Sequence, residues 1–150
     1  MKKKWSLKIL NSFKKLSELD EDFNYIINKY NFPVSRKESN TFETLMRIII
    51  GQQISRKAAE SIFEKLKDKN ITTHKNFLNA DDNYLKSLGL SFRKVIYIKD
   101  LAKKIYKNKI KLNEFENLSS KDVYNSLIKI KGIGKWTINN YQLFVLEDCD

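Results

Sequence analysis

The fold of this chain is decided by the stretch Ile128-Lys129-Ile130-Lys131-Gly132-Ile133-Gly134-Lys135-Trp136-Thr137. A run with apolar side chains at helical spacing ends at Lys131, two glycines bracket one isoleucine, and a second apolar run begins at once. Two helices joined by so short a turn form a hairpin, because the glycines give the backbone the freedom to reverse direction. We therefore predict a helix-hairpin-helix over about 120–147, with Ile133 turned inward to hold its two helices together.

This hairpin has the features of a phosphate-binding site. Glycines let the main chain approach a ligand closely, and the N–H groups that open the second helix lack intrahelical partners at the positive end of a helix dipole. The stretch therefore predicts a sequence-independent clamp for a nucleic-acid backbone. The alternative is that Gly132 only ends one helix and Gly134 only begins the next. The residues predicted to contact the backbone are Lys131, Gly132, Ile133, Gly134, Lys135 and Thr137.

The charge of the chain fits a polyanionic partner. Its 150 residues carry 29 Lys and Arg against 18 Asp and Glu, a formal net charge of +11. Only four of the 29 are arginines, and lysine, asparagine and isoleucine are all abundant, so AT-rich codon usage explains part of the excess. The length predicts one domain over residues 1–150.

Several classes of protein are excluded by composition. Cys149 is the only cysteine, which rules out a disulfide within the chain and a four-cysteine zinc or iron–sulfur site. His74, the only histidine, lies in a polar stretch and is expected to be solvated. No stretch has the apolar length of a membrane span, and the basic start at residues 1–5 is not followed by a signal-peptide pattern. A cytoplasmic, nucleoid-associated protein is expected.

Apolar residues recur at helical spacing along nearly the whole chain, and no stretch alternates with a period of two. The expected fold class is therefore all-α. Asp20, Ser55, Ser91 and either Ser119 or Ser120 are expected N-caps, and Gly89 an expected helix stop. Helices are predicted over about 6–19, 21–30, 42–50, 56–66, 74–79, 82–88, 92–105, 120–131 and 136–146.

A basic stretch precedes the hairpin. Residues 86–111 hold nine basic side chains and one acidic side chain, that of Asp100. This stretch is either the solvated back of an ordinary helix or a surface that faces DNA. The nearby hairpin favours the DNA-facing interpretation.

Three segments together resemble the helix-hairpin-helix (HhH-GPD) DNA glycosylases, specifically the 3-methyladenine DNA glycosylase II branch. They are Phe42–Ser55, Gly89–Lys94 and Ile130–Thr137, in matching order and spacing, and the resemblance covers roughly residues 20–150. It implies a multi-helix monomer that binds double-stranded DNA containing alkylated bases. Such an enzyme everts one nucleotide and hydrolyses the N-glycosidic bond of an alkylated purine.

The resemblance also implies roles for three residues. The turn at Gln52 and Gln53 matches the element that fills the gap left by the everted base, with Gln53 as the inserted residue. Alternatively, Gln53 simply ends a helix. Trp136 stands where bifunctional relatives have a nucleophilic lysine, which implies a monofunctional enzyme that uses water. Trp136 is then expected to line an aromatic pocket for a cationic purine, or else to be a core aromatic.

No catalytic residue is identified within the chain. The family's essential aspartate, which stabilises oxocarbenium character at the sugar, is expected at about 154–156, beyond Asp150. Asp148 and Asp150 come too early to be assigned that role. The helix predicted over 136–146 is apolar on nearly all sides, so further helices are expected to cover it. We therefore interpret the domain as incomplete and expect the fragment to lack activity.

No cofactor is expected, apart from a K+ or Na+ ion on main-chain carbonyls of the hairpin, which the resemblance implies. Two other functions stay open. One is a non-enzymatic helix-hairpin-helix module that binds only the DNA backbone, with strong salt dependence. The other is a helical protein-interaction domain whose lysines reflect genome composition.

Overall fold

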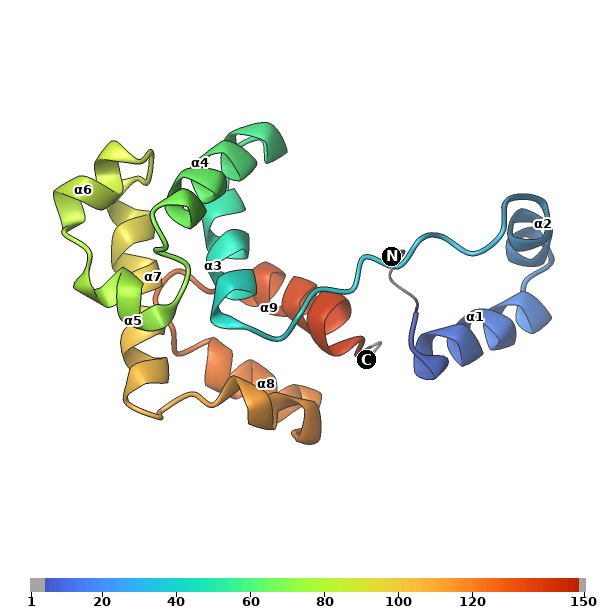
Figure 1. The fold of residues 1–150 in the computed structure, drawn as a ribbon. Coiled ribbons are helices and arrows are strands. Elements are labelled where there is room, and N and C mark those ends of the chain that lie inside the picture. Colours follow the sequence, from blue (N-terminus) through green and yellow to red (C-terminus); the bar gives the residue numbers. More distant parts are fainter. Residues whose placement is uncertain (1–4, 149–150) are drawn as a thin grey trace.

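The computed structural model describes residues 5–148, and the regular elements among them are all helices, which confirms the all-α prediction (Figure 1). Cys149 and Asp150 lie outside the described residues, as do residues 1–4. The elements in chain order are α1 (Leu7–Leu19), α2 (Glu21–Tyr30), α3 (Phe42–Gly51), α4 (Arg56–Asp68), α5 (His74–Asn79), α6 (Asp82–Ser87), α7 (Phe92–Tyr106), the 3-10 helix η1 (Leu112–Asn117), α8 (Ser120–Leu127), α9 (Lys135–Tyr141) and the π-helical turn η2 (Gln142–Leu146).

The predicted helix boundaries are mostly confirmed. The side chains of Asp20, Ser55, Ser91 and Ser119 each accept the N–H of the residue three positions on, so Ser119 rather than Ser120 is the cap of α8. Gly89 follows α6 with φ +107°, as a helix stop requires. Among the described residues, no helix is long and apolar enough to cross a membrane.

Two predicted helices are shorter than expected. α8 ends at Leu127 instead of Lys131, because the chain turns through tight bends before Gly132, whose φ is +77°. α9 ends at Tyr141 and continues only as the π-helical turn η2 before Glu147 adopts a left-handed conformation, with φ 52°.

The core lies around α3. Its residues Leu45, Met46, Ile49 and Ile50 are wholly buried, and α3 packs against α4, α7 and α9. This burial follows from the nearly continuous apolar stripe of α3. His74 is half-buried with its ring edge-on to Phe42, so it is only partly solvated.

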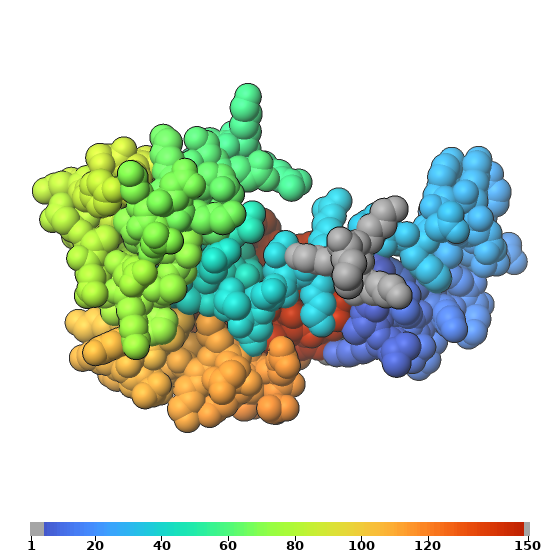
Figure 2. All heavy atoms as spheres, viewed as in Figure 1, coloured from blue at the N-terminus to red at the C-terminus, as the bar shows by residue number. Residues whose placement is uncertain are grey.

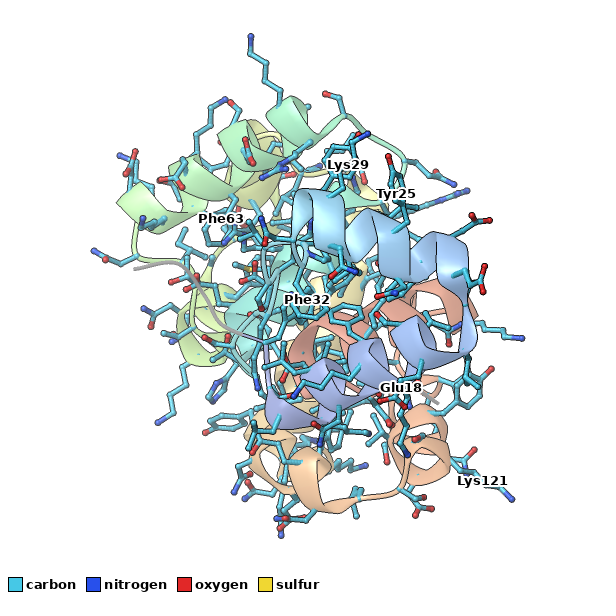
Figure 3. The ribbon with its side chains drawn as sticks, turned by 90° about the vertical axis from the view of Figure 1, so that its right-hand side faces the viewer. Glu18, Tyr25, Lys29, Phe32, Phe63 and Lys121 are labelled. Carbon is cyan, nitrogen blue, oxygen red and sulfur yellow. The ribbon has the colours of Figure 1, made fainter. Side chains whose placement is uncertain are left out.

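α1 and α2 form a pair at one end of the molecule, joined to α3 by an extended segment at residues 31–41 (Figures 1 and 2). α2 has no buried residue, and Ile9 is the only one in α1. The pair is held together by stacked and tilted contacts of Phe13 with Phe32 and Phe23, and Figure 3 shows Phe32 between the two helices. This end therefore has little core of its own.

Hydrogen bonds and ion pairs connect α1 and the segment before α3 to the chain after η2. The Glu147 carboxylate accepts the Ser6 N–H at 3.3 Å and pairs with Lys37 at 3.0 Å, and Lys8 pairs with Asp148 at 3.0 Å. Burial acts to raise the pKa of Glu147, but the hydrogen bonds from Lys37 and Ser6 hold it below its usual value. Glu147 and Asp148 thus have structural partners.

Candidate nucleic-acid interface

The hairpin forms as predicted, with α8 in contact with α9 across the turn. Gly132 has φ +77°, and a Cβ built there would lie 2.0 Å from Cδ2 of Tyr97. Both the backbone conformation and the close ring therefore require glycine. Ile133 is 4% exposed and belongs to the core, which confirms that it turns inward.

The turn presents fewer N–H groups than the sequence indicates. The Lys131 N–H donates to the Asp100 carboxylate at 2.9 Å, and the Ile133 N–H donates to the Ile130 carbonyl at 3.2 Å. Lys131 therefore keeps only its exposed side chain for a phosphate. Gly134 is the N-cap of α9 and supplies no capping side chain, so the donors suited to a phosphate are its own N–H and those of the first turn of α9, which begins at Lys135.

Gln52 and Gln53 form one tight turn at the end of α3. Gln52 has φ −61° and ψ 128°, and Gln53 follows with φ 58°, a combination typical of a type II turn. The Gln52 side-chain amide donates to the Gly132 carbonyl at 2.9 Å and to the Thr137 hydroxyl at 3.1 Å. Gln53 is exposed at the tip of the turn, beyond the end of α3. Only Gln53 is placed to act as a wedge, because Gln52 is committed to the hairpin.

Thr137 also differs from its expected position. It is 3% exposed, and its hydroxyl is the acceptor of the Gln52 amide. Its side chain therefore supports the hairpin from within and is not part of the outer surface.

One side of α7 supports both turns, and the sequence did not identify this role. Lys94, Tyr97 and Asp100 follow at intervals of three, which places them along one side of the helix. The Lys94 ammonium donates to the Ile50 carbonyl at the end of α3 at 2.6 Å, while Tyr97 and Asp100 contact Gly132 and Lys131. Asp100 is the only acidic residue in the basic stretch, and that isolation is the signal that could have found it.

Two titratable groups of α7 are shifted. Burial lowers the pKa of Lys94. Partial burial acts to raise the pKa of Asp100, but hydrogen bonds from Lys104 and from the Lys131 N–H outweigh it and hold the pKa below its usual value. Asp100 is therefore ionised beside the hairpin, and its negative charge holds the Lys131 N–H in place.

Three hollows meet around the end of α3. The hairpin hollow, of about 570 Å³, is lined by Gly51, Gln52, Gln53, Ser91, Arg93, Lys94, Tyr97, Gly132, Gly134, Trp136 and Thr137. The α9 recess, of about 560 Å³, is lined by Ser35, Arg36, Glu38, Thr44, Ile48, Gly51, Arg56, Trp136, Asn140, Phe144 and Val145. The arginine hollow, of about 330 Å³, is lined by Arg47, Gly51, Ile54, Arg56, Ala59, Glu60 and Phe63.

Trp136 is a wall of both the hairpin hollow and the α9 recess. It is 67% exposed, so the alternative that it is a core aromatic is wrong. An exposed indole between two hollows offers a face on which a planar ring can stack.

All four arginines of the chain line these hollows, at positions 36, 47, 56 and 93. The Arg47 guanidinium lies 4.5 Å from the centre of the Phe63 ring, and Arg56 pairs with Glu60 at 2.9 Å. Arginine binds phosphate in a bidentate manner that lysine does not reproduce. Its concentration here, in a chain otherwise rich in lysine, makes the surface around the end of α3 a candidate for contact with a nucleic-acid backbone.

Comparison with known proteins agrees with this geometry. The family model for HhH-GPD superfamily base excision DNA repair proteins matches residues 46–148. The chain is 29% identical over 143 residues to DNA-3-methyladenine glycosylase 1 of Schizosaccharomyces pombe. The matched region covers 90% of this chain and 63% of that protein. The chain thus spans less than two thirds of that relative.

Solved structures show the same fold. The structure of the S. pombe 3-methyladenine DNA glycosylase Mag1 in complex with abasic DNA superposes with a TM-score of 0.77 at 29% identity, covering 91% of this chain and 70% of that one. A DNA-3-methyladenine glycosidase from Bacillus halodurans gives a TM-score of 0.77 at 25% identity, covering 89% of this chain and 63% of the other.

Proposed function

Because this chain belongs to the HhH-GPD superfamily of base excision DNA repair proteins, we propose that the protein is a DNA glycosylase for alkylated purines. It everts the damaged nucleotide from double-stranded DNA and hydrolyses its N-glycosidic bond, the first step of base excision repair. The observation that carries this proposal is the exposed Trp136 ring between two hollows beside the hairpin.

The hairpin supplies the grip on the DNA strand. The N–H groups at Gly134 and Lys135 and the side chains of Lys131 and Lys135 bind a phosphate on the damaged strand. Gln53 enters the duplex from the tip of its turn and fills the gap that the everted base leaves. Its amide also hydrogen-bonds the unpaired partner base.

Trp136 recognises the damaged base. Alkylation of a purine ring nitrogen gives the base a positive charge, and a cation is attracted to an indole face as well as stacking on it. Trp136 has no amine for attack on the sugar, and the neighbouring Lys135 lies about 100° away around the helix. Water is therefore the nucleophile, and the enzyme releases the base without cutting the strand.

The carboxylate that stabilises the developing positive charge on the sugar belongs to an aspartate at about 154–156. Glu147 and Asp148 are poor alternatives, because both are already engaged in ion pairs, with Lys37 before α3 and with Lys8 in α1. We also propose a monomeric, cytoplasmic protein associated with the nucleoid. A K+ or Na+ ion on the hairpin stays a prediction, and the Ile130 and Gly132 carbonyls there already accept hydrogen bonds.

The deciding experiment incubates the full-length protein with alkylated duplex DNA and measures the released bases by chromatography. Release of methylated purines supports the proposal if the DNA strands break only after alkali is added. Salt-sensitive binding of any duplex without base release would instead indicate the non-enzymatic module. Strand cleavage without added alkali contradicts a monofunctional mechanism. The absence of DNA binding at low salt favours a protein-interaction domain.

A further inference from the structure

Two of the chain's four glycines are not required by the fold. Gly89 and Gly132 have φ of +107° and +77°, which side chains rarely adopt. Gly51 and Gly134 have no such conformation, and a Cβ built on either would meet no atom within 4 Å. Gly134 belongs to the hairpin grip already described. Gly51 has no role so far.

Helix formation alone disfavours glycine at position 51. Gly51 is the last residue of α3, where alanine forms helix more readily. Neither the backbone nor a neighbouring atom excludes a side chain there. The open space above Gly51 is therefore suited to something that approaches from outside the chain, as glycine is at sites of close ligand approach.

The position of Gly51 identifies what approaches. It lines the hairpin hollow, the α9 recess and the arginine hollow alike. The hairpin hollow and the α9 recess share two wall residues, Gly51 and Trp136, so they adjoin between these two. The hairpin hollow holds the predicted DNA contacts. The α9 recess has the size of a small-molecule site and combines the rings of Trp136 and Phe144 with a few polar groups.

We propose that Gly51 and Trp136 form the passage through which an everted alkylated purine moves from the hairpin hollow into the α9 recess, and that the missing side chain at Gly51 sets its width. This inference rests on the proposed glycosylase function. A side chain at position 51 narrows the passage from one wall and pushes the base away from the Trp136 ring on the other. The obstruction affects only nucleotides that carry a base.

The test compares Gly51→Ala and Gly51→Val with wild type in the full-length protein, on two duplexes. One contains a 7-methylguanine nucleotide with a 2′-fluorinated sugar, whose glycosidic bond resists cleavage, and the other a tetrahydrofuran abasic analogue. We expect Gly51→Ala to weaken binding of the 7-methylguanine duplex by about tenfold and Gly51→Val by more, while binding of the abasic duplex changes by less than about twofold. The melting temperature of Gly51→Ala should equal that of wild type or exceed it by about 2 °C.

Gly134→Ala is the matched control, since its Cβ also meets no atom but faces the proposed phosphate site. It should weaken binding of both duplexes equally. The proposed passage is contradicted if Gly51→Ala weakens binding of both duplexes equally. It is also contradicted if Gly51→Val leaves the binding of both duplexes unchanged. If wild type prefers neither lesion duplex to undamaged DNA, the proposed function itself fails.

Discussion

The side-chain amide of Gln52 donates to the main-chain carbonyl of Gly132 at 2.9 Å, across 80 residues of sequence. This bond joins the turn that carries Gln53 to the hairpin that is proposed to hold the DNA strand. The same amide also reaches the buried Thr137 hydroxyl. The Gln53 turn and the hairpin therefore form one unit, so the spacing between the proposed wedge and the proposed phosphate site is set by the protein itself.

Replacing Gln52 with leucine should damage both fold and function. The Gly132 carbonyl loses the hydrogen bond from the Gln52 side-chain amide, which should lower the free energy of unfolding by about 1–3 kcal/mol. Affinity for lesion DNA should also fall, because the two DNA-binding turns are no longer tied together. Chemical denaturation and a binding titration measure the two effects. Unchanged stability in Gln52→Leu contradicts the assignment of this residue to the interior of the site.

Replacing Gln53 with glycine should have the opposite effect on stability. Gln53 has φ 58°, a left-handed conformation that glycine adopts without strain, so the variant should be as stable as wild type or more stable by up to about 1 kcal/mol. The variant lacks a wedge, so base eversion should be lost. Fluorescence of 2-aminopurine placed opposite or beside the lesion reports eversion. Full eversion by Gln53→Gly would show that the side chain only ends a helix.

The Asp100→Asn variant tests whether Asp100 affects DNA binding by positioning the hairpin or only through the net charge of the protein. The substitution makes the protein more positive, so electrostatic attraction alone predicts tighter DNA binding. We expect weaker binding, because the carboxylate that fixes the Lys131 N–H and pairs with Lys104 is lost. Titration at two salt concentrations separates these effects, with Glu114→Gln as the charge-matched control, since Glu114 also pairs with a lysine but does not line the hairpin hollow.

The same residue gives a pH dependence. The pKa of Asp100 is lowered in the folded protein, so its contribution to stability is complete above its ordinary value of 3.8 and is lost as the pH falls through the folded value. Unfolding measured from pH 6 to pH 2.5 should therefore show a smaller loss of stability in Asp100→Asn than in wild type. Parallel curves for the two proteins contradict the proposed ion pair.

Gly132→Ala should be among the most harmful substitutions in the chain. Its Cβ would lie 2.0 Å from the Tyr97 ring, and its φ of +77° disfavours any side chain. The two effects together should cost about 3 kcal/mol or more. Adding Tyr97→Ala should restore the part that is due to the clash but not the backbone part. Thermal unfolding of the single and double variants measures both, and full rescue would mean that the backbone conformation carries no strain.

The helices could be predicted because their causes are local. Apolar spacing and the capping side chains of Asp20, Ser55 and Ser91 act within one or two turns. The inward Gln52 and the Asp100 contact could not be predicted, because they depend on the approach of α3 and α7 to the hairpin. A linear sequence identifies a turn rich in glutamine, but only packing decides which glutamine faces the protein.

Trp136→Ala tests the base-recognition step most directly. Because the side chain is 67% exposed, the substitution should change the unfolding free energy by less than about 0.5 kcal/mol. Base release should fall, and it should fall further for 7-methylguanine, which carries a positive charge, than for neutral hypoxanthine, since only the cation loses its attraction to the indole face. Trp136→Phe keeps a stacking surface with a weaker cation–π interaction and should lie between. Single-turnover release rates on both bases make the comparison. An equal loss for the charged and the neutral base would leave stacking as the whole contribution of Trp136 and remove the argument for a cationic substrate.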